Sequence, residues 1–360
     1  MRGEAFALIS ASALRHNYRR LCALAAPARV IAVVKADGYG HGYAHVAPVL
    51  RDAGAELFAV ARLSEAIALR GVLGDADILI LGHTLPCHAP LLAAHNLIQA
   101  VGSLDYALAL SENADHPLRI HLKLDCGMSR LGLRIASPDA LREAAAILAA
   151  PRLRAEGIFS HLPSADDPRE LSTHRHAAAA RRFAAEIASG LPFHLHASAG
   201  ILRFGGGGDA YVRAGMLLYG YAPSSALSAE GFLPAMRLYA PVLDVRTLAA
   251  GDSVSYGGAF IAPCEMRAAT LGIGYGDGFP RACGRGALCI GGLDAPILGR
   301  VCMDMTVCRI PSGADLKIGD SALIFGEDGA TLPSLAKAAG TIPYELLSAI
   351  TARVPRILVE

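Results

Sequence analysis

Charge is scarce in this sequence of 360 residues, and neither sign predominates. Charged residues make up 18% of the chain, and 33 Lys and Arg stand against 32 Asp and Glu. That balance gives no electrostatic reason to expect a nucleic acid or an anionic membrane as a partner. Hydrophobic residues reach 53%. This excludes a disordered chain and allows a large core spread over about two domains.

Long apolar runs and closely paired cysteines are also lacking. No stretch approaches the roughly 20 apolar residues of a membrane helix, and residues 1–9 lack the apolar run of a secretory signal. The eight cysteines, at positions 22, 87, 126, 264, 283, 289, 302 and 308, include no CxxC pair. In a chain this long they indicate reduced thiols, not disulfides or zinc ligands, so we expect a cytoplasmic protein.

Short apolar runs rich in β-branched residues recur through the first two-thirds of the chain. They are residues 30–34, 57–60, 78–81, 97–101, 118–124, 155–159, 193–197 and 212–218. Such runs suit strands that are buried on both faces, as in a parallel sheet. Segments with helical spacing lie between most of them. Eight strands alternating with helices predict an α/β fold, a (β/α)8 TIM barrel.

Three of the helices can be placed from the sequence. They are residues 13–26, 138–149 and 174–187. Ser10 or Ser12 is the expected N-cap of the first helix, because a serine hydroxyl can accept a hydrogen bond from a free amide of the first turn. Ser137 is the expected N-cap of the second, with Pro138 at its first helical position.

The pattern changes after Leu233, where short strands between Gly and Pro turns replace the helical spacing. These strands are predicted at residues 239–245, 267–273, 287–290, 295–301 and 321–325. We therefore predict a barrel domain over residues 10–230 and a mostly-β domain over residues 231–360. Residues 1–9 are a candidate to pair with the second domain.

Polar residues at the carboxyl ends of the predicted strands identify a candidate site, because a barrel builds its active site there. They include Lys35, Arg130, His161, Ser198 and Arg213. A lysine at the end of an apolar strand is costly to bury unless it reaches solvent or has a function. A single histidine at such a place is more often structural. The convergence of all these side chains on one barrel mouth favours catalysis.

Eight segments resemble motifs of the alanine racemase family, in the family's order and spacing. They are VVKADGYGHG (33–42), HLKLDCGMSRLG (121–132), GIFSHL (157–162), VRAGMLLYG (212–220), SVSYG (253–257), GYGDGFPR (274–281), GRVCMDM (299–305) and PYELLSAITARVPR (343–356). The resemblance covers nearly the whole chain. It implies a racemase that uses pyridoxal 5'-phosphate and works as a homodimer with shared active sites.

The resemblance also implies how the cofactor is held. Lys35 would carry it covalently and, once released by substrate, act as a base. An imine-forming lysine must be partly neutral, and desolvation and nearby cations favour that form. His161 would lie against the pyridine ring. The phosphate ligands would be Tyr39, Ser198, Tyr344 and the backbone amides of Gly215 and Met216. Hydroxyls and exposed amides suit a dianion.

Arg213 would face the pyridine nitrogen, as an arginine does in the family. A permanently protonated guanidinium takes no part in proton transfer, so the ring nitrogen stays unprotonated and the cofactor is a weaker electron sink. A weak sink favours simple proton exchange over transamination and other side reactions.

Tyr256 would be the second base and would come from the other subunit. Racemisation removes a proton from one face of a carbon and delivers one to the other, so two opposed bases are the simplest arrangement. By the same resemblance, Arg130 would bind the substrate carboxylate together with the backbone amide of Met303. Tyr275 and Asp304 would line the path of the substrate.

Three further positions bear on the site by resemblance. Lys123 is similar to a family lysine that becomes a carbamate, an anion able to orient Arg130. Ala197 precedes Ser198 where the family usually has Asn, and Leu162 follows His161 where an aromatic residue is common. Both departures remove a packing or hydrogen-bonding group near the cofactor.

Other functions remain open from the sequence. A broad-specificity or serine racemase of the same fold is one, because discrimination of one side-chain group is worth only about 1–3 kcal/mol. A related barrel decarboxylase is opposed by Arg213, since decarboxylation profits from an acid at the ring nitrogen. A non-enzymatic cofactor-binding barrel would lack the second domain, and Tyr256 and Asp304 speak against it.

Overall fold

The computed structural model describes residues 3–326 and 332–360. They form two units, each assembled from separate segments of the chain. The barrel unit combines residues 14–38 and 46–232. The β unit combines the described residues up to 13, residues 39–45 and the described part of residues 233–360. The domain limits 10–230 and 231–360 stay a prediction.

Eight parallel strands close into a barrel within residues 29–214, all of which are described. In ring order they are β5 (Ile98–Val101), β4 (Asp77–Ile80), β3 (Leu57–Val60), β2 (Arg29–Val33), β10 (Tyr211–Ala214), β9 (Phe193–Ala197), β8 (Leu153–Phe159) and β6 (Leu118–Asp125). Pairing of β6 with β5 completes the ring, and β7 (Leu133–Arg134) pairs with the end of β6. The predicted (β/α)8 barrel is confirmed.

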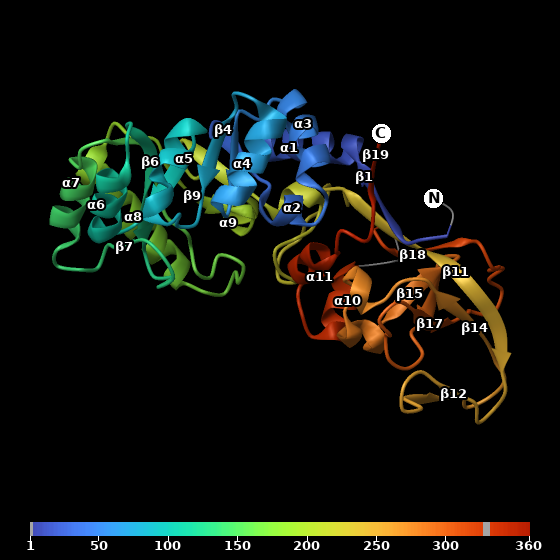
Figure 1. Cartoon of the computed structure of the whole chain (residues 1–360). Coiled ribbons are helices and arrows are strands. Elements are labelled where there is room, and N and C mark those ends of the chain that lie inside the picture. Colours follow the sequence, from blue (N-terminus) through green and yellow to red (C-terminus); the bar gives the residue numbers. More distant parts are fainter. Residues whose placement is uncertain (1–2, 327–331) are drawn as a thin grey trace. The chain divides into compact units, whose positions relative to one another are not determined.

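The barrel strands are apolar because both of their faces are covered. Every residue of β3 and of β5 is buried. The outer helices alternate with the strands along the chain (Figure 1): α1 (Ala11–Ala25), α3 (Tyr43–Asp52), α4 (Leu63–Leu73), α5 (Ala89–Ala94), α6 (Leu104–Asn113), α7 (Ala140–Leu148) and α8 (Ser172–Ala188). This alternation brings the carboxyl ends of all eight strands to one mouth.

The starts of two helices test the capping predictions. Ser10 caps α1 as expected, since its hydroxyl accepts a hydrogen bond from the amide of Ala13 at 3.1 Å. The second prediction is wrong by two residues, because α7 begins at Ala140 and not at Pro138. Ser137 instead begins a turn, with its carbonyl accepting the amide of Ala140 and its hydroxyl accepting that of Asp139.

The β unit is built on one mixed sheet. Its strands run in the order β17 (Thr306–Arg309), β14 (Met266–Leu271), β11 (Met236–Leu248), β1 (Phe6–Ser10) and β19 (Arg356–Val359), and β18 (Ser321–Phe325) also pairs with β11. Two hairpins accompany it: β12 (Ser253–Val254) with β13 (Phe260–Ile261), and β15 (Ala287–Ile290) with β16 (Leu293–Pro296). The N-terminal strand β1 pairs antiparallel with β11 and parallel with β19.

Several elements differ from the sequence-based expectation. The run predicted as a strand over 212–218 ends as a strand at Ala214, and a short 3-10 helix, η2 (Met216–Tyr219), follows. The run 295–301 leaves the strand conformation after Pro296. Two helices of the β unit, α10 (Leu332–Ala339) and α11 (Pro343–Ala349), were not predicted.

Within residues 3–326 and 332–360, no helix is both long and apolar enough to cross a lipid bilayer.

Candidate active site

Lys35 begins a left-handed turn, α2 (Lys35–Tyr39), just beyond strand β2. Residues 36–39 all have φ between 51° and 62°. A non-glycine residue pays about 1–2 kcal/mol for this conformation, so tertiary contacts must hold the turn. The amide of Ala36 donates to Oε1 of Glu65 at 2.6 Å, and the amide of Gly38 donates to the carbonyl of Val34 at 2.9 Å. Glu65, which the sequence analysis did not identify, thus fixes the chain beside Lys35.

The surroundings of Lys35 favour its neutral amine. Burial is the main cause that lowers its pKa, and the charges of Arg130 and Arg213 lower it further, against an opposing effect of Glu65. A neutral lysine amine is the form that can attack a carbonyl carbon or accept a proton. The structure therefore gives Lys35 the electrostatics expected of a covalent cofactor ligand.

Arg213 is buried at the end of β10, with 4% of its surface exposed. One terminal nitrogen, NH1, donates to Nδ1 and to the carbonyl oxygen of His194 at 2.8 and 3.0 Å. The other, NH2, donates to the carbonyl oxygens of Ser160 and Leu195 and lies 3.3 Å from Nδ1 of His161. Nε makes no hydrogen bond to the described residues. The guanidinium is thus rigidly held with one N–H left for another acceptor.

Two buried histidines extend this network away from the barrel mouth. Since Arg213 donates to Nδ1 of His194, that ring must carry its proton on Nε2, which lies 3.0 Å from Nδ1 of His121. Burial lowers the pKa of His121 to about 4 and holds that of His194 well below its usual value. Both rings are therefore neutral and their tautomers are fixed.

His161 is neutral for the same reason. Burial lowers its pKa to about 3, and Arg213 is the strongest of the nearby cations that lower it further. Its Nδ1 faces the donating NH2 of Arg213, so its proton resides on Nε2. A neutral ring at the barrel mouth fits the predicted packing against a pyridine.

Lys123 and Arg130 lie on either side of a capped turn that follows β6. Lys123 is 6% exposed, and its ammonium lies 4.6 Å from the centre of the Phe159 ring. Burial, then Arg213 and Arg130, lower its pKa to about 7. Between Lys123 and Arg130, the carboxylate of Asp125 accepts hydrogen bonds from the amides of Gly127, Met128 and Ser129 at 2.8–3.1 Å. Asp125 is thus the group that shapes the segment carrying Arg130.

Ser198 stands directly after β9 at the start of α9 (Ser198–Phe204). Its hydroxyl accepts hydrogen bonds from the amides of Gly215 and Leu217 at 3.1 and 3.4 Å. Met216 is buried in the same turn. The structure thus brings together three of the five predicted phosphate ligands, a hydroxyl beside backbone amides that follow two neighbouring strands.

The other two predicted phosphate ligands lie in the β unit and are close to each other. The ring centres of Tyr39 and Tyr344 are 6.0 Å apart at an angle of 52°. Burial raises the pKa of Tyr39, which keeps its phenol protonated. Gly40 lies so close to α11 that an added Cβ would stand 2.0 Å from the carbonyl oxygen of Leu347. This contact fixes Tyr39 relative to the helix that carries Tyr344.

Tyr256 lies on the loop between β12 and β13, and 68% of its surface is exposed. The preceding Ser255 has a φ of 68° and donates a hydrogen bond from its hydroxyl to the carbonyl of Arg300 at 2.8 Å. Gly299 approaches so closely that a Cβ there would lie 2.8 Å from Cβ of Ser255. The loop that presents Tyr256 is therefore attached to the segment 299–305.

The same segment positions the remaining predicted residues of the β unit. The amide of Tyr275 donates to the carbonyl of Cys302 at 3.0 Å, and that of Gly276 donates to the carbonyl of Met303 at 2.8 Å. Asp304 accepts a hydrogen bond from Arg353 at 2.9 Å. Hydrogen bonds thus join the segments that carry the four predicted residues. These residues are all exposed: Tyr256, Tyr275, Met303 and Asp304.

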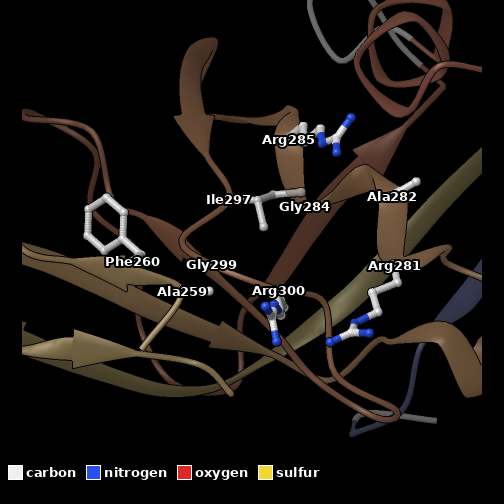
Figure 2. Close-up of a pocket in the computed structure, with 9 residues that line it drawn as sticks. All are labelled: Ala259, Phe260, Arg281, Ala282, Gly284, Arg285, Ile297, Gly299 and Arg300. Carbon is white, nitrogen blue, oxygen red and sulfur yellow. The ribbon is translucent and has the colours of Figure 1, made fainter. Parts of the chain in front are cut away.

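Two adjoining hollows lie beside these loops. One, of about 330 Å³, is lined by Tyr256, Tyr275, Arg281 and Val301. The other, of about 580 Å³, shares Arg281 and is shown in Figure 2, where Arg285 and Arg300 contribute two further guanidinium groups and Phe260 and Ile297 an apolar wall. A carboxylate group approaching Tyr256 would meet a positive surface. None of these arginines was predicted from the sequence as a site residue.

The two departures from the family motifs have different structural settings. Leu162 is buried in a cluster with Leu195, Ala199 and Cys126, so it supports the barrel mouth by packing alone. Ala197 is the extended residue before α9 and has no polar side chain to offer. Its neighbours supply the hydrogen bonds of that turn.

Comparison with known proteins identifies the family. The profile described as "Alanine racemase, N-terminal domain" matches residues 9–223, and "Alanine racemase, C-terminal domain" matches residues 235–358. The chain is 38% identical to the curated alanine racemase of Desulfosudis oleivorans, over 98% of this chain and 96% of that protein. It is also 38% identical to that of Yersinia pestis, over 97% of each.

Solved structures agree with this result. The alanine racemase of Clostridium difficile 630 superposes with a TM-score of 0.93 at 31% identity, covering 100% of this chain and 97% of that one. The biosynthetic alanine racemase of Pseudomonas aeruginosa superposes with a TM-score of 0.89 at 34% identity, covering 99% and 100%. With both domains matched and a full-length likeness in sequence and structure, the chain belongs to the alanine racemase family.

Proposed function

We propose that this protein interconverts L-alanine and D-alanine, with Lys35 and Tyr256 as the two bases. One observation carries the residue assignment. Lys35 follows strand β2 at the mouth of the barrel with its pKa lowered by burial and by two arginines, which favours an amine that can accept a proton there. The curated relatives bear the alanine racemase name, and a broad-specificity or serine racemase is not favoured.

The residues of the barrel mouth fit pyridoxal 5'-phosphate. A poorly protonated lysine suits the aldehyde, and the hydroxyl of Ser198 beside the amides of Gly215 and Met216 suits the phosphate. Nε of Arg213 can donate to a pyridine nitrogen, and neutral His161 can pack on the ring. Tyr39 and Tyr344 stay proposed phosphate ligands on the resemblance of their motifs. When bound, the cofactor withdraws electrons from the substrate's α-carbon and so lowers the cost of removing its proton.

The protein's own groups then move the proton. Arg130 pairs with the substrate carboxylate and fixes the α-carbon, because a guanidinium binds a carboxylate at two points. Nζ of Lys35 takes or delivers the proton on one face, and the phenol oxygen of Tyr256 does so on the other. Arg213 remains charged and donates only, so it offers no acid that would strengthen electron withdrawal.

We further propose that Tyr256, Tyr275, Met303 and Asp304 act on the site of a partner subunit, in a homodimer. Tyr256 is two-thirds exposed on a rigid loop, which suits a side chain that enters another chain's site. Tyr275 and Asp304 would border the path of the substrate, and the amide of Met303 would assist Arg130. A cytoplasmic location also stays a prediction.

Mixing two inactive variants tests the shared site. Lys35→Ala and Tyr256→Phe should each abolish racemisation, measured by chiral chromatography of alanine. In a heterodimer one site lacks both bases and the other retains both, so random exchange should restore about one quarter of wild-type activity. Verified subunit exchange without any recovery would show that each chain supplies both bases to its own site.

A further inference from the structure

A buried polar cluster of the barrel unit lies beside the turn that begins with Ser198 and takes no part in the proposed proton transfers. The side chain of Asp209, 1% exposed, accepts a hydrogen bond from Nε of Arg181 at 2.8 Å and one from the amide of Leu195 at 3.1 Å. The ring of His196 lies between Arg181 and Gly205, with Nδ1 3.0 Å from the carbonyl of Gly205 and Nε2 3.3 Å from NH2 of Arg181.

These contacts permit one form of the His196 ring. A carbonyl can only accept, so Nδ1 carries the proton, and a guanidinium can only donate, so Nε2 is bare. Burial lowers the pKa of His196, and the charge of Arg181 also lowers it, against the bond to Gly205 and the charge of Asp209. The ring is therefore a neutral link that accepts on one side and donates on the other.

The glycine run at residues 205–208 is shaped to this cluster. Gly207 has a φ of 62°, and a Cβ there would lie 2.4 Å from Cε1 of His196 and 2.7 Å from NH2 of Arg181. A Cβ on Gly206 would lie 2.2 Å from the carbonyl oxygen of Ala25. Glycine is needed at position 207 because the backbone there passes directly over the His196 ring, and at position 206 because the backbone there passes against the carbonyl of Ala25.

The cluster ties together the two elements that carry the proposed phosphate ligands. His196 is the next-to-last residue of β9. It bonds to Gly205, which caps the far end of α9, so it links both ends of the helix that begins with Ser198. Asp209 links β9 to the segment leading into β10, and β10 leads to Gly215. Ala197, between His196 and Ser198, contributes no side-chain hydrogen bond.

We infer that His196, held by Arg181 and Asp209, is a positioning residue that fixes Ser198 relative to Gly215 and so sets the affinity for the cofactor's phosphate group. This inference rests on the proposed function, since it concerns the same cofactor.

The test compares two probes on the protein freed of cofactor, pyridoxal 5'-phosphate and pyridoxal, which differ only in the phosphate. Dissociation constants are measured by absorbance titration. His196→Ala should raise the Kd for pyridoxal 5'-phosphate by about ten-fold or more and leave the Kd for pyridoxal nearly unchanged. His196→Asn should recover most of the loss, because its amide can still donate toward Gly205.

His174→Ala is the matched control. His174 lies exposed on α8, and its ring contacts Phe204 at 5.3 Å, much as His196 does at 5.4 Å, but it makes no hydrogen bond in the described structure. The His174→Ala variant should bind both probes with the same Kd values as the wild type. If His196→Ala does not fold, Arg181→Met is the second variant, because Arg181 is one-third exposed, and it should show the same selective loss.

An equal loss for both probes, or no loss for either, would overturn the inference while the wild type still binds the cofactor. A wild-type protein that binds neither probe would overturn the proposed function, and the inference with it.

Discussion

Arg213 donates a hydrogen bond of 2.8 Å from NH1 to Nδ1 of His194, so a buried cation is held by a neutral ring instead of a carboxylate. Its other hydrogen bonds to the described residues also go to uncharged acceptors, the carbonyls of Ser160, His194 and Leu195 and the ring of His161. The positive charge at the barrel mouth is thus oriented without being neutralised. It remains available to lower the pKa of Lys35 and to attract anions.

Replacing Arg213 by lysine tests the value of this orientation. A lysine keeps the charge but cannot serve so many acceptors at once, so buried carbonyls lose charge-assisted bonds worth about 1.5–3 kcal/mol each. We expect a lower free energy of unfolding in urea and a loss of racemase activity by about a hundred-fold or more. Arg203→Lys is the control, since Arg203 also donates to carbonyls but from a half-buried position. Equal effects in both variants would contradict a special role for Arg213.

The neutral histidines predict acid sensitivity. The pKa of His121 is about 4 in the folded chain, whereas an unfolded histidine takes up its proton below about pH 6.5. Between these pH values the unfolded state binds more protons than the folded state does. As the pH is lowered, the free energy of unfolding should therefore fall by about 1.4 kcal/mol per pH unit for this ring. His194, also lowered by burial, adds to the slope.

Urea denaturation at about pH 7, 6 and 5 measures this slope. His121→Gln should reduce the slope by the contribution of one histidine. The control His116→Gln, at an exposed position, should leave the slope unchanged. A slope that His121→Gln does not alter would mean that other groups cause the acid sensitivity.

The barrel was predictable from the sequence because its strands are buried on both faces. The apolar runs 57–60 and 193–197 coincide with β3 and β9, and the other six differ from the observed strands at their ends. Helices α10 and α11 were missed since they are short and follow a region of strands. The start of α7 was misplaced because Ser137 forms a turn whose contacts imitate a cap.

Site residues within a sequence motif could be predicted, whereas the backbone atoms that bind and orient them could not. Lys35 and Arg213 could be named, but the carbonyls of Ser160 and Leu195 that orient Arg213 leave no trace in the side-chain pattern. His121 could have been found, since it lies two residues before Lys123 and so on the same face of β6. The left-handed turn at residues 36–39 contains one glycine, and tertiary contacts impose the rest.

Asp125 should control substrate binding through Arg130. Asp125→Ala removes the acceptor of three backbone amides, so the segment that carries Arg130 should become mobile. We expect the KM for alanine to rise by about ten-fold, with a smaller change in kcat, because poorly held groups bind less well. Asp167→Ala, which also removes an acceptor for a backbone amide but on an exposed loop, should leave KM unchanged. If Asp125→Ala lowers the melting temperature but leaves KM unchanged, Asp125 has a purely structural role.

Lys123 should react with carbon dioxide. Its pKa of about 7 leaves much of the amine neutral near neutral pH, and a neutral amine can attack carbon dioxide. The nitrogen–carbon bond forms as one carbon–oxygen π bond of carbon dioxide opens to a carboxylate, and the nitrogen releases one proton to solvent, so the neutral amine becomes an anion. Starting from the ammonium form, two protons are released and a cation is replaced by an anion. Beside Arg130 and Arg213 an anion is stabilised where a cation is repelled, so the surroundings that lower the pKa also favour the carbamate.

Carbon NMR with isotope-labelled bicarbonate at about pH 8 should therefore show a carbamate that Lys123→Met abolishes. Lys317 is an internal control, because its ion pair with Asp315 at 2.8 Å raises its pKa and keeps it protonated. Removal of carbon dioxide should raise the KM for alanine in the wild type, since Arg130 would lose an anion that orients it, and should not affect Lys123→Met. If the wild type gives no carbamate signal, Arg130 must be oriented by Asp125 and the capped turn alone.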